Sequence, residues 1–457
     1  MSAYTALCSS LLFPLHEWAK GHASVGVRRR LERSEWWMPP QLEAYRVARL
    51  RGFLIDIGDR VPHYRSLFRQ CRFDPAGVAS LSDLQALPLL TKADIRSHLE
   101  ALKAEHHGPL SRYNTGGSSG EPLIFFIGKD RSSHDVGAKW RVTRWWGVDI
   151  GDREIVVWGS PIELGAQDKV RMLRDRMLRT KLIPAFEMSE ANLDAFLREI
   201  RAMRPKMLFG YPSALSHIAR HAEAKGVRMD DLGIRVAFTT SERLYDEQRR
   251  QIAQTFACRV ANGYGGRDAG FIAHECPAGG MHLTAEDIIV EIVDSAGRVL
   301  PPGQSGEIVV THLATQDFPF IRYRTGDIGV LDENACPCGR GLPMLKEIQG
   351  RATDFLVAQN GTVMHGLALI YILRDLPGVA QFKIIQESVD RTRIQIATTA
   401  AFKESAIPAI IAGVKQRLGQ GVAVEVERVI EVAKEKSGKF RYVVSHVNSS
   451  PTTGEGA

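Results

Sequence analysis

The chain has 457 residues and a mass of 50.7 kDa, enough for two or three domains with substantial buried cores. Its composition of 44% hydrophobic and 24% charged residues excludes a disordered, collagen-like or coiled-coil chain. No apolar run reaches the about 18 residues that a membrane-spanning helix needs. We therefore expect no transmembrane segment. Six cysteines are too few for a disulfide framework, so we also expect reduced thiols and a cytoplasmic location.

Lysine and arginine exceed the acidic residues by 59 to 52, a formal charge of +7. Such an excess attracts nucleic acid, anionic lipid or a polyphosphate cofactor, and it also arises from solvated helix faces. Residues 1–13 are mildly apolar without a charged leader, which predicts either part of the fold or a surface-docking strip. Two runs contribute to the excess: Arg28, Arg29, Arg30 and Arg33; and Lys169, Arg171, Arg174, Arg176, Arg179 and Lys181.

The first predicted domain covers residues 1–349 and changes character twice. Residues 1–107 show helical spacing, for example at 42–57, and Thr91 is a helix-capping residue. In residues 108–281 short apolar strands alternate with helices, which predicts an α/β core with a largely parallel sheet. Residues 282–349 are strand-rich. The expected core strands are 123–127, 155–158, 207–209 and 236–240, and the expected helices are 134–146, 192–203 and 214–224.

A smaller α+β domain is predicted for residues 350–447. It begins with an Asn360-Gly361 hairpin turn and continues with helices and strands in alternation. The polar tail at 448–457 is predicted to be disordered. The expected helices are 367–374 and 408–418, and the expected strands are 382–385, 394–397 and 422–426.

The strongest local motif is a loop rich in glycine and hydroxyl side chains. Glycines let consecutive backbone N–H groups turn toward one anion, and the hydroxyls add donors to phosphate oxygens. Judged alone, the loop fits a phosphate-binding loop and a flexible surface turn equally well. It consists of Thr115, Gly116, Gly117, Ser118, Ser119 and Gly120, followed by the predicted strand.

Three further motifs contain residues that could bind a nucleotide, although each motif judged alone also fits an ordinary structural role. In residues 262–268, Tyr264 and Gly265 offer a ring for a purine, and Asp268 a carboxylate for Mg²⁺, although a plain glycine-rich turn fits as well. Asp327 follows a glycine and suits either a turn or ribose hydroxyls. Lys439 follows Ser437-Gly438, where a solvated basic patch is the alternative.

In their order, these segments resemble the phosphate loop, adenine-and-magnesium motif, ribose motif and C-terminal lysine motif of the adenylate-forming superfamily. The resemblance spans residues 115–441 and includes a Gly-Glu strand at 306–310 and a Gly-Arg hinge at 350–354. The segments 209–213, 239–242, 276–282 and 336–340 resemble the branch of phenylacetate-CoA ligases and capsular polysaccharide biosynthesis proteins.

The resemblance implies a large adenylate-forming domain with a small mobile C-terminal lid. It implies activation of a carboxylic acid by ATP with pyrophosphate release, then acyl transfer to a nucleophile, commonly the thiol of coenzyme A. An amine, a hydroxyl or a carrier-protein thiol is the alternative acceptor. The resemblance also assigns roles to individual residues. The phosphate loop would cradle the β- and γ-phosphates, and Tyr264 would pack on adenine near Gly265, Ser241 and Glu242. Asp268 would bind Mg²⁺, Asp327 the ribose hydroxyls, and Arg351 the ribose or the phosphates, while Lys439 would bridge the substrate carboxylate and the α-phosphate.

Cys276-x5-His282 and Cys336-x-Cys338 supply three thiols and an imidazole, a set that suits closed tetrahedral Zn²⁺. We expect a structural zinc here. Cys258 and His274 are the alternative ligands, and buried free thiols remain the alternative to any metal.

The acid-binding pocket and the partners are less constrained by the sequence. Trp158, Phe186, Phe209 and Tyr211 are candidates to line the pocket, and each also fits a plain core role. A non-catalytic basic binding protein is the alternative of another class, but no aromatic-basic module supports specific nucleic-acid binding. A homodimer stays open.

Overall fold

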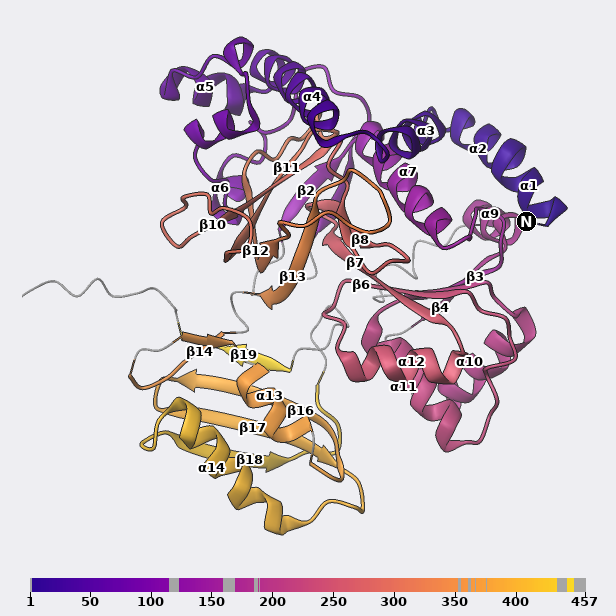
Figure 1. Cartoon of the computed structure of the whole chain (residues 1–457), viewed down its shortest axis with the longest axis vertical. Coiled ribbons are helices and arrows are strands. Elements are labelled where there is room, and N and C mark those ends of the chain that lie inside the picture. Colours follow the sequence, from indigo (N-terminus) through magenta and orange to yellow (C-terminus); the bar gives the residue numbers. More distant parts are fainter. Residues whose placement is uncertain are drawn as a thin grey trace, which may run out of the picture. The chain divides into compact units, whose positions relative to one another are not determined.

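The chain folds into two compact units, one comprising Met1–Thr325 and Gly329–Ile348, the other Gly326–Ile328 and Gln349–Ala457 (Figure 1). The computed structural model describes residues 2–114, 123–158, 169–184, 188, 190–351, 355–360, 363–365, 367–374, 376–433 and 442–447.

The first unit begins with helices, as predicted. Prolines at the first helical positions of α4 and α5 need no N–H partner there, and Thr91 and Asp94 form a reciprocal capping box at α6. The elements are α1 (Ala3–Leu7), η1 (Cys8–Leu12), α2 (Phe13–Ala19), α3 (Ser24–Ser34), α4 (Pro39–Arg60), α5 (Pro62–Cys71), η2 (Pro75–Gly77), η3 (Leu81–Ala86) and α6 (Lys92–Ser97).

A hairpin and a five-stranded parallel section follow. The strands β3, β5 and β6 coincide with the predicted strands to within one residue. The elements are β1 (Ser111–Asn114), β2 (Ile124–Ile127), α7 (Lys129–Trp145), β3 (Glu154–Trp158), α9 (Lys169–Leu178), β4 (Thr180–Pro184), α10 (Glu190–Met203), β5 (Met207–Gly210), α11 (Pro212–Ala224), β6 (Val236–Thr240), α12 (Asp246–Phe256) and β7 (Arg259–Gly266).

Helices cover both faces of this parallel section because its inner strands β3, β5 and β6 are apolar on both faces. Leu208 and Ala237 face α10, α11 and α12, whereas their neighbours Phe209 and Phe238 pack with Trp146 beside α7 (Figure 1). Side chains alternate between the two faces along a strand, so each face acquires its own core.

The strand-rich region extends the same sheet, so the sheet is mixed rather than largely parallel. Its order is β10-β11-β12-β13-β9-β8-β7-β6-β5-β3-β4, and the pairs β7–β8, β8–β9, β9–β13 and β10–β11 are antiparallel. The added strands are β8 (Gly270–Glu275), β9 (Met281–Leu283), β10 (Ile288–Val293), β11 (Ser305–His312), β12 (Tyr323–Leu331) and β13 (Met344–Arg351).

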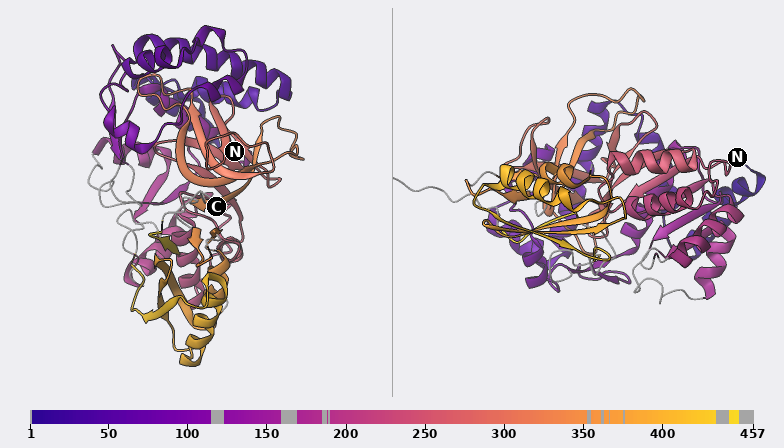
Figure 2. Two further views of the ribbon diagram at one scale, coloured as in Figure 1. Left: turned by 90° about the vertical axis from the view of Figure 1, so that its left-hand side faces the viewer. Right: turned by 90° about the horizontal axis from the view of Figure 1, so that it is seen from below.

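The second unit has a four-stranded sheet in the order β18-β17-β16-β19 and a separate β14–β15 hairpin. Helices α13 and α14 contact each other and lie on one face of the sheet (Figure 2). The elements are β14 (Phe355–Val357), β15 (Val363–His365), α13 (Leu367–Arg374), β16 (Val379–Ser388), β17 (Arg391–Thr398), η5 (Glu404–Ala406), α14 (Ile407–Leu418), β18 (Ala423–Arg428) and β19 (Val443–Ser445).

The first basic run does not form an open cationic face. Arg28 is buried with its guanidinium over the Trp140 ring, and Arg30 pairs with the buried Asp287 at 2.7 Å. Among the helices that the structure describes, none combines the length and apolarity that crossing a bilayer demands.

Candidate functional site

Three of the predicted site residues lie at the carboxyl ends of neighbouring parallel strands. Gly210 of β5 stands opposite Thr239 of β6, and Thr240 opposite Gly263 of β7. Tyr211, Ser241 and Tyr264, which lie at or just beyond these positions, therefore share one edge of the sheet. Open α/β sheets bind their ligands at this edge.

The segment after β6 has an unusual backbone. Ser241 adopts a left-handed conformation, with φ of 70°, which is rare for a residue with a side chain. Its neighbour Glu242 accepts a hydrogen bond of 3.2 Å from the backbone N–H of Ser213, at the start of α11. Burial, together with the charge of Glu242, raises the pKa of Tyr211. Glu242 thus fixes the beginning of α11 against the strand ends, a role that its sequence position did not reveal.

The segment 262–268 is mostly strand rather than turn. Strand β7 continues to Gly266, and only residues 267–269 turn into β8. A Cβ atom on Gly265 would lie 2.1 Å from the carbonyl oxygen of Gly270, so only glycine fits this close approach. The narrow hairpin presents the half-exposed Asp268 at its tip.

A hydroxyl from another strand orients Asp268. Tyr323, buried on β12, donates a hydrogen bond of 2.6 Å to Asp268 Oδ2. Tyr323 stands four residues before Asp327 on the same strand. The contact therefore ties the magnesium motif to the strand that carries the ribose motif.

Aromatic rings join the hairpin of the phosphate loop to this strand. Tyr113 on β1 stacks on Phe125 of β2, Phe125 packs against Phe320, and Phe320 packs against Tyr323, with ring centroids 6.1, 6.3 and 5.1 Å apart. Burial lowers the pKa of Arg267, and nearby Tyr113 opposes that shift. The strand leading into the loop thus ends near the Asp268 turn.

The turn rests on a buried ionic network. Arg131 of α7 donates to the backbone carbonyl of Arg267 at 3.2 Å and grips both carboxylate oxygens of Asp135 at 3.0 Å. His134 and His312 lie beside this pair with ring centroids 4.7 Å apart. The ligand atoms of His134, Asp135 and His312 are close enough together to hold a metal ion. The Asp135 carboxylate is already paired with the Arg131 guanidinium, however, so we assign these residues to holding the turn at 267–269 in place.

Two arginines anchor β12 near Asp327. Arg322 is buried and pairs with Glu291 at 3.0 Å, and Arg324 pairs with Glu307. Glu307 belongs to the predicted Gly-Glu strand, which is β11. This acid therefore fixes the ribose-motif strand from its neighbour in the sheet.

Several predicted residues lie outside the described part of the chain. These are Thr115, Gly116, Gly117, Ser118, Ser119, Gly120, Lys439, Phe186, the side chain of Arg351 and the tail 448–457.

The described aromatic candidates for the acid pocket form a stack. Trp158 stacks on Tyr211 with centroids 4.5 Å apart, and Phe209 follows at 6.0 Å from Trp158. Phe209 also lies under the Lys139 ammonium and belongs to the core beside α7. Trp158 and Tyr211 lie at the strand ends and so are the better placed of the three.

The predicted zinc ligands converge on one point. The ligand atoms of Cys276, His282, Cys336 and Cys338 lie within 4.8 Å of one another, with the Cys276 and Cys336 sulfurs 3.6 Å apart. His282 Nε2 is 3.2 Å from Cys338 Sγ, while its Nδ1 is 3.3 Å from the carbonyl oxygen of Leu342. Burial lowers the pKa of His282 to about 4, so its imidazole is neutral at pH 7.

The alternative zinc ligands do not join the quartet. Among the residues that the structure describes, Cys258 and His274 belong to no cluster with metal-binding spacing. Burial raises the pKa of Cys258 to about 12 and lowers that of His274 to about 3.

Comparison with known proteins finds relatives that align with most of the chain. Residues 181–314 match the AMP-binding enzyme family, and residues 356–446 match the CapK C-terminal domain. The chain is 23% identical to Protein CapK of Staphylococcus aureus over 80% of this chain and 81% of CapK. It is 27% identical to the phenylacetate-coenzyme A ligase of Pseudomonas putida over 70% of this chain and 73% of the ligase.

A solved structure of 2-hydroxyisobutyryl-CoA ligase has the same fold. It superposes with a TM-score of 0.73 at 22% identity, over 90% of this chain and 91% of the ligase. The order of the motifs, the two family matches and the fold agree. The chain belongs to the adenylate-forming superfamily of AMP-binding enzymes, in the branch of phenylacetate-CoA ligases and CapK proteins.

Proposed function

We propose that the chain joins a carboxylic acid to ATP, releases pyrophosphate and passes the acyl group from acyl-AMP to the thiol of coenzyme A. The observation that carries the proposal is the Tyr323–Asp268 hydrogen bond, because it brings two motifs from distant parts of the sequence to one place. The names of the relatives, phenylacetate-coenzyme A ligase among them, support the CoA-dependent second step.

The described residues fit a nucleotide with its Mg²⁺ ion. Asp268 offers a hard carboxylate oxygen at the tip of the β7–β8 hairpin, while Tyr264 offers a ring at the strand ends. Mg²⁺, when bound, would neutralise phosphate charge. Asp327 would hold the ribose hydroxyls, with Ser241 and Glu242 bordering the adenine.

The reaction brings two anions together, so it depends on positioning and on positive charge at the reacting centre. We assign the phosphate cradle to Thr115–Gly120, the bridging charge between the carboxylate and the α-phosphate to Lys439, and a contact from the hinge to Arg351. The carboxylate oxygen attacks the α-phosphorus and pyrophosphate leaves. The thiolate of coenzyme A then attacks the acyl carbon, and AMP leaves.

A panel of carboxylic acids, assayed for pyrophosphate release and for acyl-CoA by mass spectrometry with and without coenzyme A, tests the proposal. We expect at least one aryl, branched or hydroxylated acid to give AMP and an acyl-CoA thioester. Pyrophosphate release without any thioester would reject coenzyme A and favour an amine, hydroxyl or carrier-protein acceptor. Formation of ADP instead of AMP would reject the adenylation step itself.

We further propose that Cys276, His282, Cys336 and Cys338 hold one structural Zn²⁺. Three sulfurs and one imidazole nitrogen suit a closed tetrahedral site, and the Leu342 carbonyl accepts from Nδ1–H, which directs Nε2 toward the thiols. Such a site would join the segment after β8 to the segment between β12 and β13.

Metal analysis of the purified chain should find one zinc per chain. Cys336→Ser should lose the metal and lower the melting temperature, whereas Cys71→Ser, which changes an exposed thiol, should do neither. Far less than one zinc per chain, with no effect of Cys336→Ser, would reject the site.

A further inference from the structure

The N-terminal helical segment 3–19 presents an uncharged face to solvent. Solvated helix faces normally carry charged side chains. Here the exposed fractions of Leu7, Leu11, Leu15 and Trp18 are 44%, 49%, 52% and 78%. We call these four residues the apolar ridge. All the exposed residues of the segment are uncharged: Ala3, Ala6, Leu7, Ser10, Leu11, Leu15, Trp18 and Ala19.

The opposite side of this segment is fixed to the body of the first unit. Thr5 donates to Asp152 at 2.8 Å, and the Tyr4 hydroxyl donates to the carbonyl of Met177 at 2.8 Å. A Cβ atom on Gly151 would lie 2.3 Å from Cys8 Cβ, so the packing there is close. The ridge is therefore held outward by a firm base.

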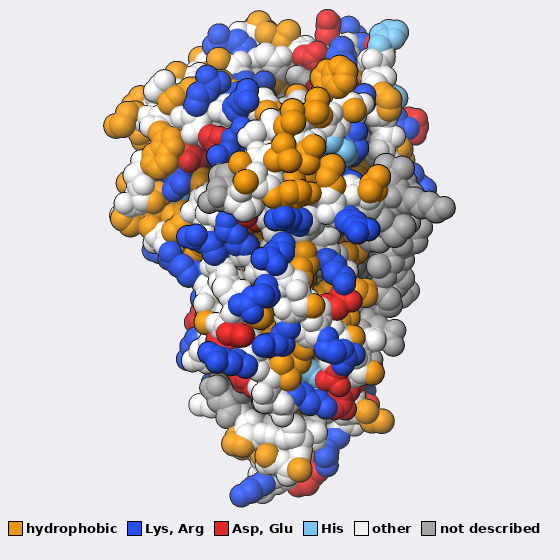
Figure 3. Space-filling model, turned by 90° about the vertical axis from the view of Figure 1, so that its right-hand side faces the viewer, with side chains coloured by type: hydrophobic (Ala, Val, Ile, Leu, Met, Phe, Trp, Pro, Cys, Tyr) orange, Lys and Arg blue, Asp and Glu red, His pale blue; other side chains and the backbone are white. Residues whose placement is uncertain are grey.

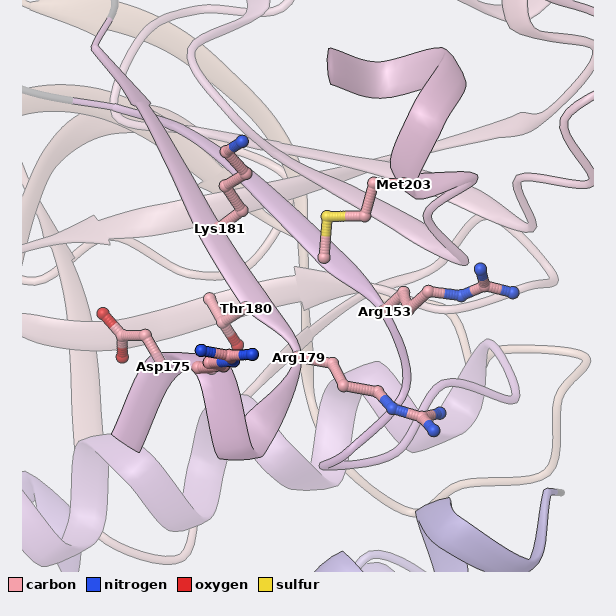
Figure 4. Close-up of a pocket in the computed structure, with 7 residues that line it drawn as sticks. Arg153, Asp175, Arg179, Thr180, Lys181 and Met203 are labelled. Carbon is pink, nitrogen blue, oxygen red and sulfur yellow. The ribbon is translucent and has the colours of Figure 1, made fainter. Parts of the chain in front are cut away.

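A basic hollow lies beside this base. It has a volume of about 570 Å³ and is lined by Arg153, Arg176, Arg179 and Lys181, with Asp175 as its one acid (Figure 4). Asp175 is already paired with Arg174 at 2.5 Å. Lys181 pairs with Glu199 at 3.0 Å, whereas within the described part of the chain no carboxylate pairs with Arg153, Arg176 or Arg179.

The hollow adjoins the base of the segment that carries the ridge. The guanidinium of Arg179, which lines the hollow, lies over the Tyr4 ring, 3.8 Å from its centroid. Leu173 on α9 adds a further apolar side chain that is 71% exposed. Figure 3 looks onto the side of the molecule where Figure 1 places the N-terminal helices and α9, and on that side hydrophobic side chains gather next to a broad band of Lys and Arg side chains.

The hollow is separate from the candidate nucleotide site. Arg153 precedes β3 and Arg179 precedes β4, so the hollow lies at the amino ends of parallel strands. Ser241 and Tyr264 lie at the carboxyl ends. The hollow therefore lies at the opposite edge of the sheet from the candidate nucleotide site.

We propose that this face docks on an anionic lipid surface, with the apolar ridge in the interfacial layer and the basic hollow over headgroup phosphates. Interfacial helices combine leucine and tryptophan on one side with cationic side chains nearby, and each Lys or Arg near an anionic bilayer strengthens binding about five-fold. Nucleic acid would engage the hollow without the ridge. Two-fold pairing of two copies through the ridge would bring two basic hollows together.

Co-sedimentation of the full chain with vesicles tests the proposal. We expect binding to phosphatidylcholine vesicles that contain phosphatidylglycerol, little binding to phosphatidylcholine alone, and a loss of binding as salt is raised. The double variant Leu11→Ser/Trp18→Ser should weaken binding about ten-fold or more. Arg153→Gln/Arg176→Gln should weaken it by about five-fold per residue.

Matched variants change similar side chains elsewhere. Met38→Ser removes a side chain that is 70% exposed outside the ridge, and Arg417→Gln removes an exposed cation from the second unit. Neither should alter vesicle binding. Trp18 emission should shift to the blue on anionic vesicles, and Trp18→Phe should abolish the shift.

Three results would overturn the proposal. One is equal binding to neutral and anionic vesicles, and another is binding unaffected by either double variant. The third is that the parent chain does not bind vesicles, is a dimer in light scattering, and becomes a monomer in the variant Leu11→Ser/Trp18→Ser. This result would show that the ridge binds a second copy of the chain.

Discussion

At the scale of single residues, the Tyr323 hydroxyl decides how Asp268 is presented. Tyr323→Phe removes the donor to Asp268 Oδ2 and leaves the buried ring in place. A hydrogen bond to a charged group contributes about 1.5–3 kcal/mol, so we expect the apparent Mg²⁺ affinity in acid-dependent pyrophosphate exchange to fall at least about ten-fold. Titration of Mg²⁺ at saturating ATP measures the change.

Tyr64→Phe is the matched control. The Tyr64 hydroxyl is also buried; it donates to the Pro319 carbonyl at 3.0 Å and accepts from the Ile321 backbone N–H at 3.1 Å. Its loss should lower the melting temperature without changing the Mg²⁺ dependence. If both variants shift the Mg²⁺ dependence equally, Tyr323 has no specific role at Asp268.

Site residues were predictable from the sequence where side chains of one chemical type lie a few positions apart. Cys276, His282, Cys336 and Cys338 stood out because three thiols and one imidazole suit a closed zinc site, and their ligand atoms lie within 4.8 Å of one another. Tyr323 and Arg131 were missed because each acts across the fold, and their sequence neighbourhoods do not show the contacts to Asp268 and Arg267.

At the scale of elements, the β7–β8 hairpin depends on a close backbone approach. Gly265→Ala places a methyl group 2.1 Å from the Gly270 carbonyl oxygen, so the hairpin must open. Overpacking of this kind costs about 1–3 kcal/mol, which we expect as a loss of unfolding free energy in urea. The KM for ATP should rise as well, because the displaced turn carries Asp268.

A glycine in open space provides the comparison. At Gly52 of α4, no atom beyond the chain neighbours and the nearby backbone of the helix itself lies within 4 Å of the place that an alanine methyl group would take. Gly52→Ala should therefore stabilise the chain by up to about 1 kcal/mol. If Gly265→Ala and Gly52→Ala change the free energy of unfolding equally, the close approach of Gly265 to Gly270 is contradicted.

The strand β8 carries a buried histidine that makes stability depend on pH. Burial lowers the pKa of His274 to about 3, while an unfolded histidine titrates near 6.5. The unfolded chain thus binds more protons between these values, and stability falls as the pH drops below 6.5. From pH 7 to 5, this residue should cost about 2 kcal/mol of unfolding free energy.

His274→Gln removes the titrating ring and isolates its contribution. Urea unfolding of both chains at pH 7 and pH 5 should show a smaller acid-induced loss in the variant. An identical loss would show that His274 is not the source.

The core elements were the predictable part of the fold. Strands β3, β5 and β6 follow from short apolar runs between helical patterns, since both their faces are buried. Strands β7 and β12 were not predicted, because their glycines favour turns locally and their extension comes from pairing within the sheet.

At the scale of the whole molecule, assays of the two half-reactions, adenylation and acyl transfer, test the role that we propose for Lys439 of the second unit. Lys439→Ala should abolish acid-dependent pyrophosphate exchange, because the bridging charge is needed only for adenylation. Transfer from supplied acyl-AMP to coenzyme A should stay comparatively intact. Lys403→Ala, an exposed lysine of the same unit, should change neither step.

Equal loss of both half-reactions in Lys439→Ala would remove the role that we assign to this lysine. The sequence motif alone carries that assignment, because Lys439 lies outside the described residues. The fold of the second unit was predictable to a greater extent. The expected helices match α13 and α14 to within one residue, and the expected strands overlap β16, β17 and β18, of which β16 and β17 are longer than expected.

The most direct test of the central claim is acid-dependent exchange of labelled pyrophosphate into ATP by the unmodified chain. This measurement needs no acyl acceptor, so it reports adenylation alone. We predict exchange with at least one carboxylic acid, a requirement for Mg²⁺, and no exchange without acid. Absence of exchange across a broad panel of acids, in a folded chain that binds ATP, would contradict the account.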